Sequence, residues 1–319
     1  MTTLKIGTRG SALALAQSNM IRTALMAAQP ELAVELVIIT TKGDLILDRA
    51  LSRIGDKGLF VTEIEQALLR GEIDLAVHSC KDLPAETLPG LALAAFPRRA
   101  DPRDALVSRH GLGLRALPVG ARIGTSSLRR TSQLRAFRPD FAIVNLRGNV
   151  DTRLRKARSE DYDAIVLAAA GLHRLGLDDA ITEYLEPDIL LPAVAQGTLA
   201  LECRADDART LALVAPLNDA ATAASTVAER ALLARLHGGC QVPIAAWARH
   251  TADGLELHGM IGTPDGQHVV RAAQAAPLDA PHPAELGIAV AELLLERGGY
   301  AILEQLRHVI PAVEILAAP

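Results

Sequence analysis

The sequence predicts an α/β protein with two similar halves, built on mixed sheets around a cleft, and a smaller C-terminal α+β domain. Its 319 residues exceed what one hydrophobic core usually holds. Short apolar strands alternate with helical stretches through the first two thirds, as in α/β folds. Ile-Gly-Thr, a turn with serine and then a helix occur at residues 6–13 and again at 123–130. Because this match stands near the start of each half, it indicates an internal duplication.

The composition and the net charge of the chain argue against several classes of function. Half of the residues are hydrophobic, only 3% are aromatic and the net charge is −4, which argues against a general nucleic-acid binder. No apolar run is long enough to span a bilayer, and the first residues lack a secretory signal. Cys80, Cys203 and Cys240 are too widely spaced for a disulfide framework or a paired metal motif. We expect a cytoplasmic protein with no metal, nucleic-acid or membrane partner.

The first half is expected to hold strands at 4–7, 35–40, 73–77 and 91–96, and helices at 12–28 and 59–70. Strand 4–7 turns directly into its helix, whose free N–H groups favour an anion, and Arg9 adds a bidentate donor. The expected buried face of that helix is Leu13, Ala16, Met20, Ala24 and Ala27. Segment 41–58 is interpreted as a mobile loop or a long surface connection.

The stretch 73–84 changes abruptly from apolar to polar where its strand ends. Its second half contains His78, Ser79, Lys81 and Asp82, and Pro84 stops a regular continuation. In open α/β sheets, ligands bind at the rim formed by such strand ends. The alternative is a solvated loop in which Ser79 or Asp82 caps a helix.

The second half begins after a charged, Pro-flanked boundary at 97–104, with a strand at 105–107 and others at 142–146 and 164–168. Arginines stand just after its strands or in first helical turns: Arg129, Arg130, Arg147, Arg153 and Arg174. With Arg9 they indicate a site for several carboxylates or phosphates, and the alternative is a basic solvated face. Two halves with anion sites facing one cleft match the plan of two-domain periplasmic binding proteins.

The last third starts at a Pro/Gly crossover, 191–197, after which strand 198–203 should return to the first half. Helix 222–236 leads into a Gly-Gly turn before Cys240, which favours an exposed thiol, or else a glycine cap before a buried cysteine. A hairpin at 255–261 and 268–273 and helices at 283–297 and 300–306 complete an α+β domain. The expected domains are 1–97 with 198–216, 103–191, and 220–319.

Six motifs make the chain resemble the porphobilinogen deaminase family, also called the hydroxymethylbilane synthases. In the family's order, they are Thr8-Arg9-Gly10-Ser11, Lys57-Gly58-Leu59-Phe60, Ala76-Val77-His78-Ser79-Cys80-Lys81-Asp82, Gly124-Thr125-Ser126-Ser127-Leu128-Arg129-Arg130, Leu146-Arg147-Gly148-Asn149-Val150 and Gly238-Gly239-Cys240-Gln241-Val242-Pro243. The match extends to about residue 247, and the helical tail fits more loosely.

The resemblance implies a transferase of tetrapyrrole (haem) biosynthesis with two type II binding-protein-like domains and a third, small domain. It implies a dipyrromethane cofactor held by a thioether to Cys240, which primes the addition of four porphobilinogen molecules. Each addition releases ammonia, and hydrolysis then frees linear hydroxymethylbilane. The family also suggests a monomer.

The resemblance assigns roles residue by residue, with Asp82 as the catalytic carboxylate. The cofactor-binding residues it implies are Cys240, Asp82, Lys81, Thr125, Ser126, Ser127, Arg129, Arg130, Arg147 and Gly148. The substrate-binding residues it implies are Arg9, Ser11, Lys57, Phe60, His78, Arg147, Arg153, Arg174 and Gln196. The arginines would match the acetate and propionate of each pyrrole, and Asp82 would stabilise the cation left by ammonia.

Two positions depart from the family's pattern. Ala195 stands where a crossover glycine is expected, and His237 stands where an acidic residue is familiar. A non-catalytic oxyanion-binding module would explain the arginines, but not the Gly-Gly-Cys turn or the third domain. A nucleotide-phosphate transferase would use the same arginines, but the sequence has no Walker motif and no evident cluster of metal-binding carboxylates.

Overall fold

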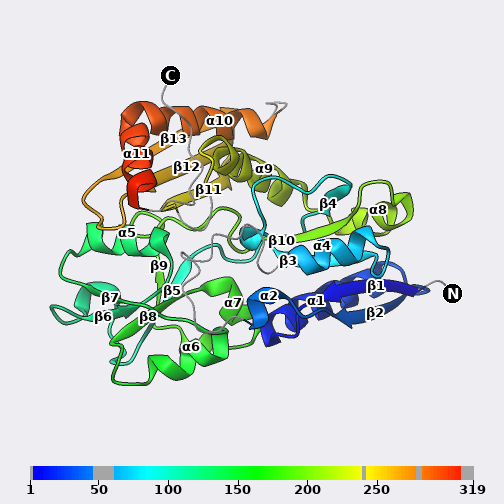
Figure 1. The fold of residues 1–319 in the computed structure, drawn as a ribbon, viewed down its shortest axis with the longest axis horizontal. Helices are drawn as coiled ribbons and strands as arrows, with labels where there is room; N and C mark the ends of the chain where they lie inside the picture. Colours follow the sequence, from blue (N-terminus) through cyan, green and yellow to red (C-terminus); the bar gives the residue numbers. More distant parts are fainter. Residues whose placement is uncertain (1–2, 46–60, 239–241, 278–281, 310–319) are drawn as a thin grey trace. The chain divides into compact units, whose positions relative to one another are not determined.

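The computed structural model describes residues 3–45, 61–238, 242–277 and 282–309, whose order along the chain is shown in Figure 1. These residues divide into two compact units. Unit 1 contains the described residues up to 100 together with 197–223, and unit 2 contains 101–196 and those from 224 onward. Most of the loop expected at 41–58 lies outside the described residues.

Unit 1 is built on a five-stranded mixed sheet of order β2-β1-β3-β10-β4. The strands are β1 Thr3–Thr8, β2 Ala33–Ile38, β3 Leu75–Ser79, β4 Leu91–Ala95 and β10 Leu199–Arg204. β1 is parallel to β2 and β3, whereas β10 is antiparallel to β3 and β4. The place of β10 in this sheet confirms that the chain returns to the first half after the crossover at 191–197.

The helices of unit 1 are α1 Ala12–Ala28, α2 Lys42–Leu45, α4 Thr62–Leu69 and α8 Ala208–Val214, with short 3-10 turns η1 Cys80–Asp82 and η4 Ala215–Leu217. The side chains that α1 buries are Gln17, Ser18, Ile21 and Leu25. The predicted face was therefore wrong, and Met20 is 49% exposed. Apolar residues occur on nearly every side of α1, so its orientation is set by the sheet, where Gln17 donates to Ser79 Oγ at 2.8 Å.

Unit 2 begins with a second five-stranded mixed sheet, of order β7-β6-β8-β5-β9. The strands are β5 Asp104–Ser108, β6 Arg122–Gly124, β7 Ala142–Val144, β8 Ala164–Ala168 and β9 Glu183–Leu185. β6 is parallel to β7 and β8, and β5 is antiparallel to β8 and β9. This is the topology of unit 1 with β6 in the place of β1, which confirms the internal duplication.

The glycine of each Ile-Gly-Thr repeat is required by close packing. A Cβ on Gly7 would lie 2.3 Å from Ile73 Cδ1, and one on Gly124 would lie 2.7 Å from Tyr162 Cδ1. Each repeat then runs into a helix capped by serine: Ser11 Oγ accepts from the α1 backbone, and Ser127 Oγ accepts from Arg130 N. The two repeats are therefore alike in packing and in capping.

The other helices near this sheet are α5 Leu128–Phe137, α6 Val150–Ala157 and α7 Ala169–Arg174, with η2 Leu114–Ala116 and η3 Asp178–Ala180. Asn149 caps α6, since its side-chain oxygen accepts from Thr152 N at 3.0 Å. In both units, helices therefore start directly after the carboxyl ends of parallel strands.

The rest of unit 2 contains a three-stranded antiparallel sheet, β11-β12-β13. Its strands and helices are β11 Ile244–His250, β12 Gly254–Gly262, β13 Val269–Pro277, α10 Pro283–Leu294 and α11 Tyr300–Val309. They follow α9 Ala220–Arg235, which starts at the end of unit 1 and continues into unit 2. The predicted hairpin is confirmed as β12 and β13, and α10 packs against both strands. The helix expected to end at Arg297 ends earlier, because η5 Leu295–Gly299 turns the chain with Gly298 at φ 113°.

The predicted fold class is confirmed by these three sheets: two mixed sheets of equal topology, and a small antiparallel sheet with helices. Among the described residues, no single helix is long and apolar enough to cross a membrane. The residues from Ala208 to Leu217 and from Ala220 to Arg235 reach that length and hydropathy only when they are taken together, across a bend of 108°.

Candidate active site

The first group of predicted site residues lies at one edge of the unit 1 sheet. β1 and β3 are parallel neighbours, so their carboxyl ends share this edge. Arg9 and Ser11 follow β1, and Lys81 and Asp82 follow β3 within η1. The sequence alone predicted this grouping because both motifs directly follow apolar strands.

The Asp82 carboxylate is exposed. Among the described residues it takes part in no hydrogen bond or ion pair, and η1 has no side-chain cap. Ser79 does not cap a helix either, since its hydroxyl oxygen accepts from Gln17. The alternative of a capping residue at either position is therefore wrong, and Asp82 is left free to meet a ligand.

His78 lies inside the sheet rather than at its edge. Its side chain is 6% exposed, and its Nε2 lies 3.0 Å from Oε2 of Glu202, which is 1% exposed. Burial raises the pKa of nearby Glu65, and the charge of Glu202 adds to this effect. Sequence reasoning missed Glu202 because it sits within an apolar strand. The assignment of His78 to the substrate stays a prediction.

The second group of predicted residues lies at the matching edge of the unit 2 sheet. Because β6, β7 and β8 are parallel, the segments that follow them start at one edge. The residues placed there are Thr125, Ser126, Ser127, Arg129, Arg130, Arg147 and Gly148, with Arg153 on α6 and Arg174 at the end of α7. The Ser126 hydroxyl lies 2.6 Å from Asn145 Oδ1 and 2.5 Å from the Leu146 carbonyl oxygen, which ties two of these segments together.

Arg129 and Arg130 share one fully buried carboxylate, that of Asp104. Arg129 Nη1 lies 2.8 Å from Asp104 Oδ2, and Arg130 Nη2 lies 2.6 Å from Asp104 Oδ1. Both guanidinium groups are at most 7% exposed. Burial alone would raise the pKa of Asp104, but the charges of the two arginines outweigh burial and hold it well below its usual range.

Other contacts orient the same cluster. Gln196 Nε2 donates to Asp104 Oδ1 at 3.0 Å, Arg129 donates to the Leu191 carbonyl, and Arg130 donates to the Val166 carbonyl. Three of the five N–H donors of Arg130 are used in these bonds. Sequence reasoning placed Asp104 in a charged linker and missed its role. The sequence signal that could have revealed this role is the position of the carboxylate, directly before the apolar strand 105–107.

Of the remaining arginines of this edge, Arg147 forms no ion pair with the described residues. Nη2 of Arg147 is buried and has no hydrogen-bond partner among them. Arg153 Nε donates to the Gly148 carbonyl at 2.7 Å, and Gly148 has φ 116°. Burial lowers the pKa of Arg174 to about 10, so this side chain keeps its charge at neutral pH.

Two of the three cysteines lie within the described residues, and both are buried. Cys80 and Cys203 are free and buried, and burial raises the pKa of Cys203 to about 11, which makes that thiol a poor nucleophile. Cys240 lies outside the described residues, as do Lys57 and Phe60.

The two departures from the motif pattern share one backbone feature. Ala195 (φ 57°) and His237 (φ 48°) are the described non-glycine residues with positive φ. The Ala195 N–H donates to Oε2 of buried Glu229 at 2.5 Å. His237 closes α9, with its own N–H bonded to Ala234 and that of Gly238 bonded to Leu233. Both positions therefore favour glycine, although each is occupied by another residue.

Comparisons with known proteins agree with the family that the six sequence motifs indicate. The model "Porphobilinogen deaminase, dipyromethane cofactor binding domain" matches residues 4–212, and "Porphobilinogen deaminase, C-terminal domain" matches 223–296. The porphobilinogen deaminase of Roseiflexus sp. (strain RS-1) is 60% identical over 94% of this chain and 98% of its own. That of Halalkalibacterium halodurans is 48% identical over 96% of this chain and 98% of its own.

Solved structures also match this chain, at low sequence identity and with low TM-scores. The methionine-binding protein MetQ is 13% identical, with a TM-score of 0.43, and covers 67% of this chain and 89% of its own. A YaeC-family lipoprotein from Enterococcus faecalis V583 is 12% identical, with a TM-score of 0.41, and covers 68% and 91%. The two family models and the close relatives along nearly the whole length show that this chain belongs to the porphobilinogen deaminase family.

Proposed function

We propose that this chain joins four porphobilinogen molecules head to tail onto a covalently bound dipyrromethane primer and then releases hydroxymethylbilane by hydrolysis. The observation that carries the proposal is that each unit, taken by itself, presents one kind of group at the carboxyl edge of its sheet. One edge presents the exposed, unpartnered carboxylate of Asp82, and the other presents several arginines. A cationic intermediate and an anionic pyrrole chain need these two kinds of group.

The residues of the unit 2 edge fit a dipyrromethane group. Each of its rings carries an acetate and a propionate, so it needs several donors for carboxylates. Arg147 Nη2 is buried without a partner, which is costly unless a ligand completes it. Arg130 retains two N–H donors after its bonds to Asp104 and Val166. When bound, the group would supply the nucleophilic pyrrole carbon to which each new unit is joined.

The residues of this chain would hold, orient and neutralise the growing product. Arg129, Arg130 and Arg147 would bind carboxylates of the primer, assisted by Lys81, Thr125, Ser126, Ser127 and Gly148. Arg9, Ser11, Arg153, Arg174 and Gln196 would bind those of the incoming unit. Lys57, Phe60 and His78 are also proposed for the substrate, from the motifs alone. Because Asp104 forms ion pairs with Arg129 and Arg130, their guanidinium groups are oriented before the ligand arrives.

Asp82 would act on the incoming unit. Its carboxylate would accept hydrogen bonds from pyrrole N–H groups and stabilise the positive charge that develops as ammonia leaves. The same carboxylate could take up the proton released when the ring regains aromaticity. These roles need a carboxylate that no other side chain holds, and that is the state of Asp82 among the described residues.

Cys240 would carry the primer. Of the chain's cysteines, Cys80 and Cys203 are buried, which leaves Cys240 as the thiol suited to a covalent bond with a bulky group. Free, unbridged thiols also support a cytoplasmic protein. We propose three domains, 1–97 with 198–216, 103–191 and 220–319, since each of these spans holds a sheet of its own. We also propose a monomer, as the family resemblance suggests.

Two measurements on the purified protein test this proposal. Intact mass should exceed the sequence mass by two linked pyrrole units, and Cys240→Ala should remove the excess. Incubation with porphobilinogen should release one ammonia per unit consumed and form hydroxymethylbilane. A protein that has the sequence mass and binds porphobilinogen without releasing ammonia would be an oxyanion-binding module instead.

A further inference from the structure

Unit 2 contains a cavity of about 420 Å³ beside the β11-β12-β13 sheet, apart from the residues assigned to the reaction. α10 packs against β12 and β13. The segment from Glu186 to Leu191 borders the cavity from the neighbouring sheet, and all of these parts belong to unit 2. Its volume falls within the range of small-molecule sites, on the order of 300–1,000 Å³.

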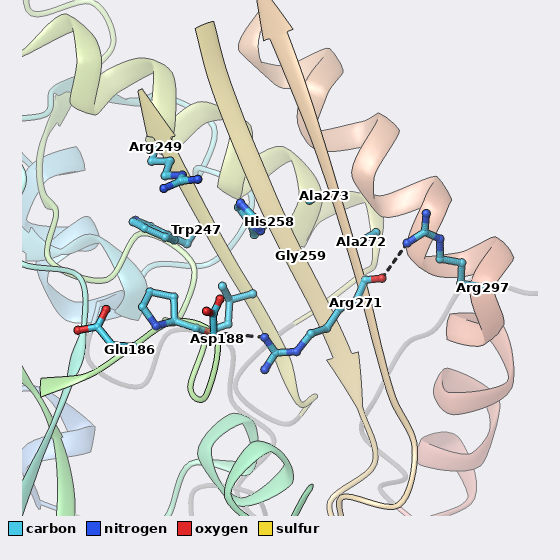
Figure 2. Close-up of a pocket in the computed structure, with 12 residues that line it drawn as sticks. Glu186, Asp188, Trp247, Arg249, His258, Gly259, Arg271, Ala272, Ala273 and Arg297 are labelled. Atoms are coloured by element: carbon cyan, nitrogen blue, oxygen red, sulfur yellow. Dashed lines mark hydrogen bonds between the residues drawn. The ribbon is translucent and has the colours of Figure 1, made fainter. Parts of the chain in front are cut away.

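One wall of the cavity is aromatic. Trp247 on β11 and His258 on β12 are register partners, and their rings lie 6.2 Å apart with an interplanar angle of 31°. Figure 2 shows the two side chains next to each other on neighbouring strands. Arg249 lies over the Trp247 ring, at 5.6 Å from its centroid. A flat ligand ring could stack on this wall.

The charged side chains that line the cavity carry a net positive charge. Glu186 is paired with Arg103 at 2.8 Å, although Arg103 also pairs with Asp101 at 2.7 Å, and Arg249 is paired with Glu256 at 2.6 Å. The other fixed charges of the lining are Arg271, Arg297 and Asp188. The lining itself therefore holds three positive side chains, Arg249, Arg271 and Arg297, against two negative ones, which suits a ligand with a single negative charge.

Arg271 is held in place by neutral groups. Its Nη2 donates to Gln133 Oε1 at 3.0 Å, and its Nη1 is 3.4 Å from the Pro187 carbonyl oxygen. Arg297 donates to the Arg271 carbonyl at 3.0 Å, as Figure 2 shows. No ion pair among the described residues involves either guanidinium group. Arg271 therefore has a fixed position and further N–H donors, and the charge of Asp188 acts on it although no ion pair joins the two.

We infer that this cavity is a second ligand site, which binds a small aromatic monocarboxylate. The ligand ring stacks on Trp247 and His258, and its carboxylate pairs with Arg271 and Arg297. This site is separate from the proposed reaction, and its occupation does not require the primer or catalysis.

The cavity can be tested by fluorescence because Trp247 is the only tryptophan of the chain. The purified protein is titrated with sodium benzoate at constant ionic strength while tryptophan emission is followed. We expect a saturable change below about 10 mM. Cyclohexanecarboxylate, which has the charge but no aromatic ring, and benzamide, which has the ring but no charge, should each bind at least tenfold more weakly.

Substitutions of residues in the lining test whether benzoate binds in this cavity. Arg271→Gln and Arg297→Gln should each weaken benzoate about tenfold or more, because each loses a charge-assisted contact. Arg209→Gln, which alters an exposed arginine that does not line the cavity, should bind like the parent protein. Melting temperatures show whether each variant is folded, and Arg297 is an exposed residue whose loss leaves the core intact. The inference is overturned if benzoate gives no saturable change, if cyclohexanecarboxylate binds equally well, or if both cavity variants keep full affinity.

Discussion

Replacing Asp104 by asparagine should destabilise the protein more than most single substitutions. The Asp104 carboxylate is fully buried and is contacted by Arg129, Arg130 and Gln196 at 2.6–3.0 Å. The neutral amide would leave two guanidinium groups buried without a counter-charge and turn its N–H₂ toward one of them. Removing one partner of a buried ion pair costs about 3–5 kcal/mol. This is a large share of a total stability of about 5–15 kcal/mol.

The assay is urea unfolding of the purified protein, followed by circular dichroism at neutral pH. The pKa of Asp104 is lowered in the folded protein, so its stabilising contribution is present above the unfolded pKa of about 3.9. That contribution is lost as the pH falls through the lower, folded pKa. The difference between the parent and Asp104→Asn should therefore be constant near neutrality and shrink only in strong acid.

The matched control is Asp140→Asn. Asp140 also pairs with an arginine, since Arg138 Nη2 lies 2.6 Å from its Oδ2, but the pair lies at the surface. It should shift the unfolding midpoint far less than Asp104→Asn does. If Asp104→Asn loses less than about 1 kcal/mol, or no more than the control, the buried cluster does not contribute as argued.

Three further predictions concern the site. Asp82→Asn should keep the fold and most of the primer but lower porphobilinogen turnover about 10²–10³-fold, while Asp82→Glu should retain more activity; near-normal turnover in Asp82→Asn would move the catalytic role elsewhere. Arg147→Lys should impair primer loading, seen by intact mass, because lysine cannot form a bidentate pair; Arg155→Lys on exposed α6 surface is its control, and equal loading in both would contradict the carboxylate role. Ala195→Gly should raise the free energy of unfolding by up to about 1 kcal/mol, since glycine accepts the φ of 57° without strain, and a loss of stability would show that Ala195 is not strained.

Local signals in the sequence determined most of the secondary structure and the two groups of site residues. Apolar runs, serine and asparagine caps and turn residues act over a few neighbours, so strands such as β8 and helices such as α1 match their predicted bounds. The duplicated Ile-Gly-Thr turn predicted two equivalent sheets for the same reason. Since ligands bind at the carboxyl ends of parallel strands, polar residues after those strands marked Asp82 and the arginines.

Only the tertiary structure decided which residues meet across long separations. Asp104 joins Arg129, Arg130 and Gln196. Glu202 meets His78 because β10 returns beside β3. The cavity beside Trp247 requires the segment after β9 to lie against the last sheet. The buried side of α1 could not be chosen locally either, because its apolar residues surround the helix. These features depend on pairing and burial between distant segments, which residue spacing does not encode, whereas caps and strand ends depend only on near neighbours.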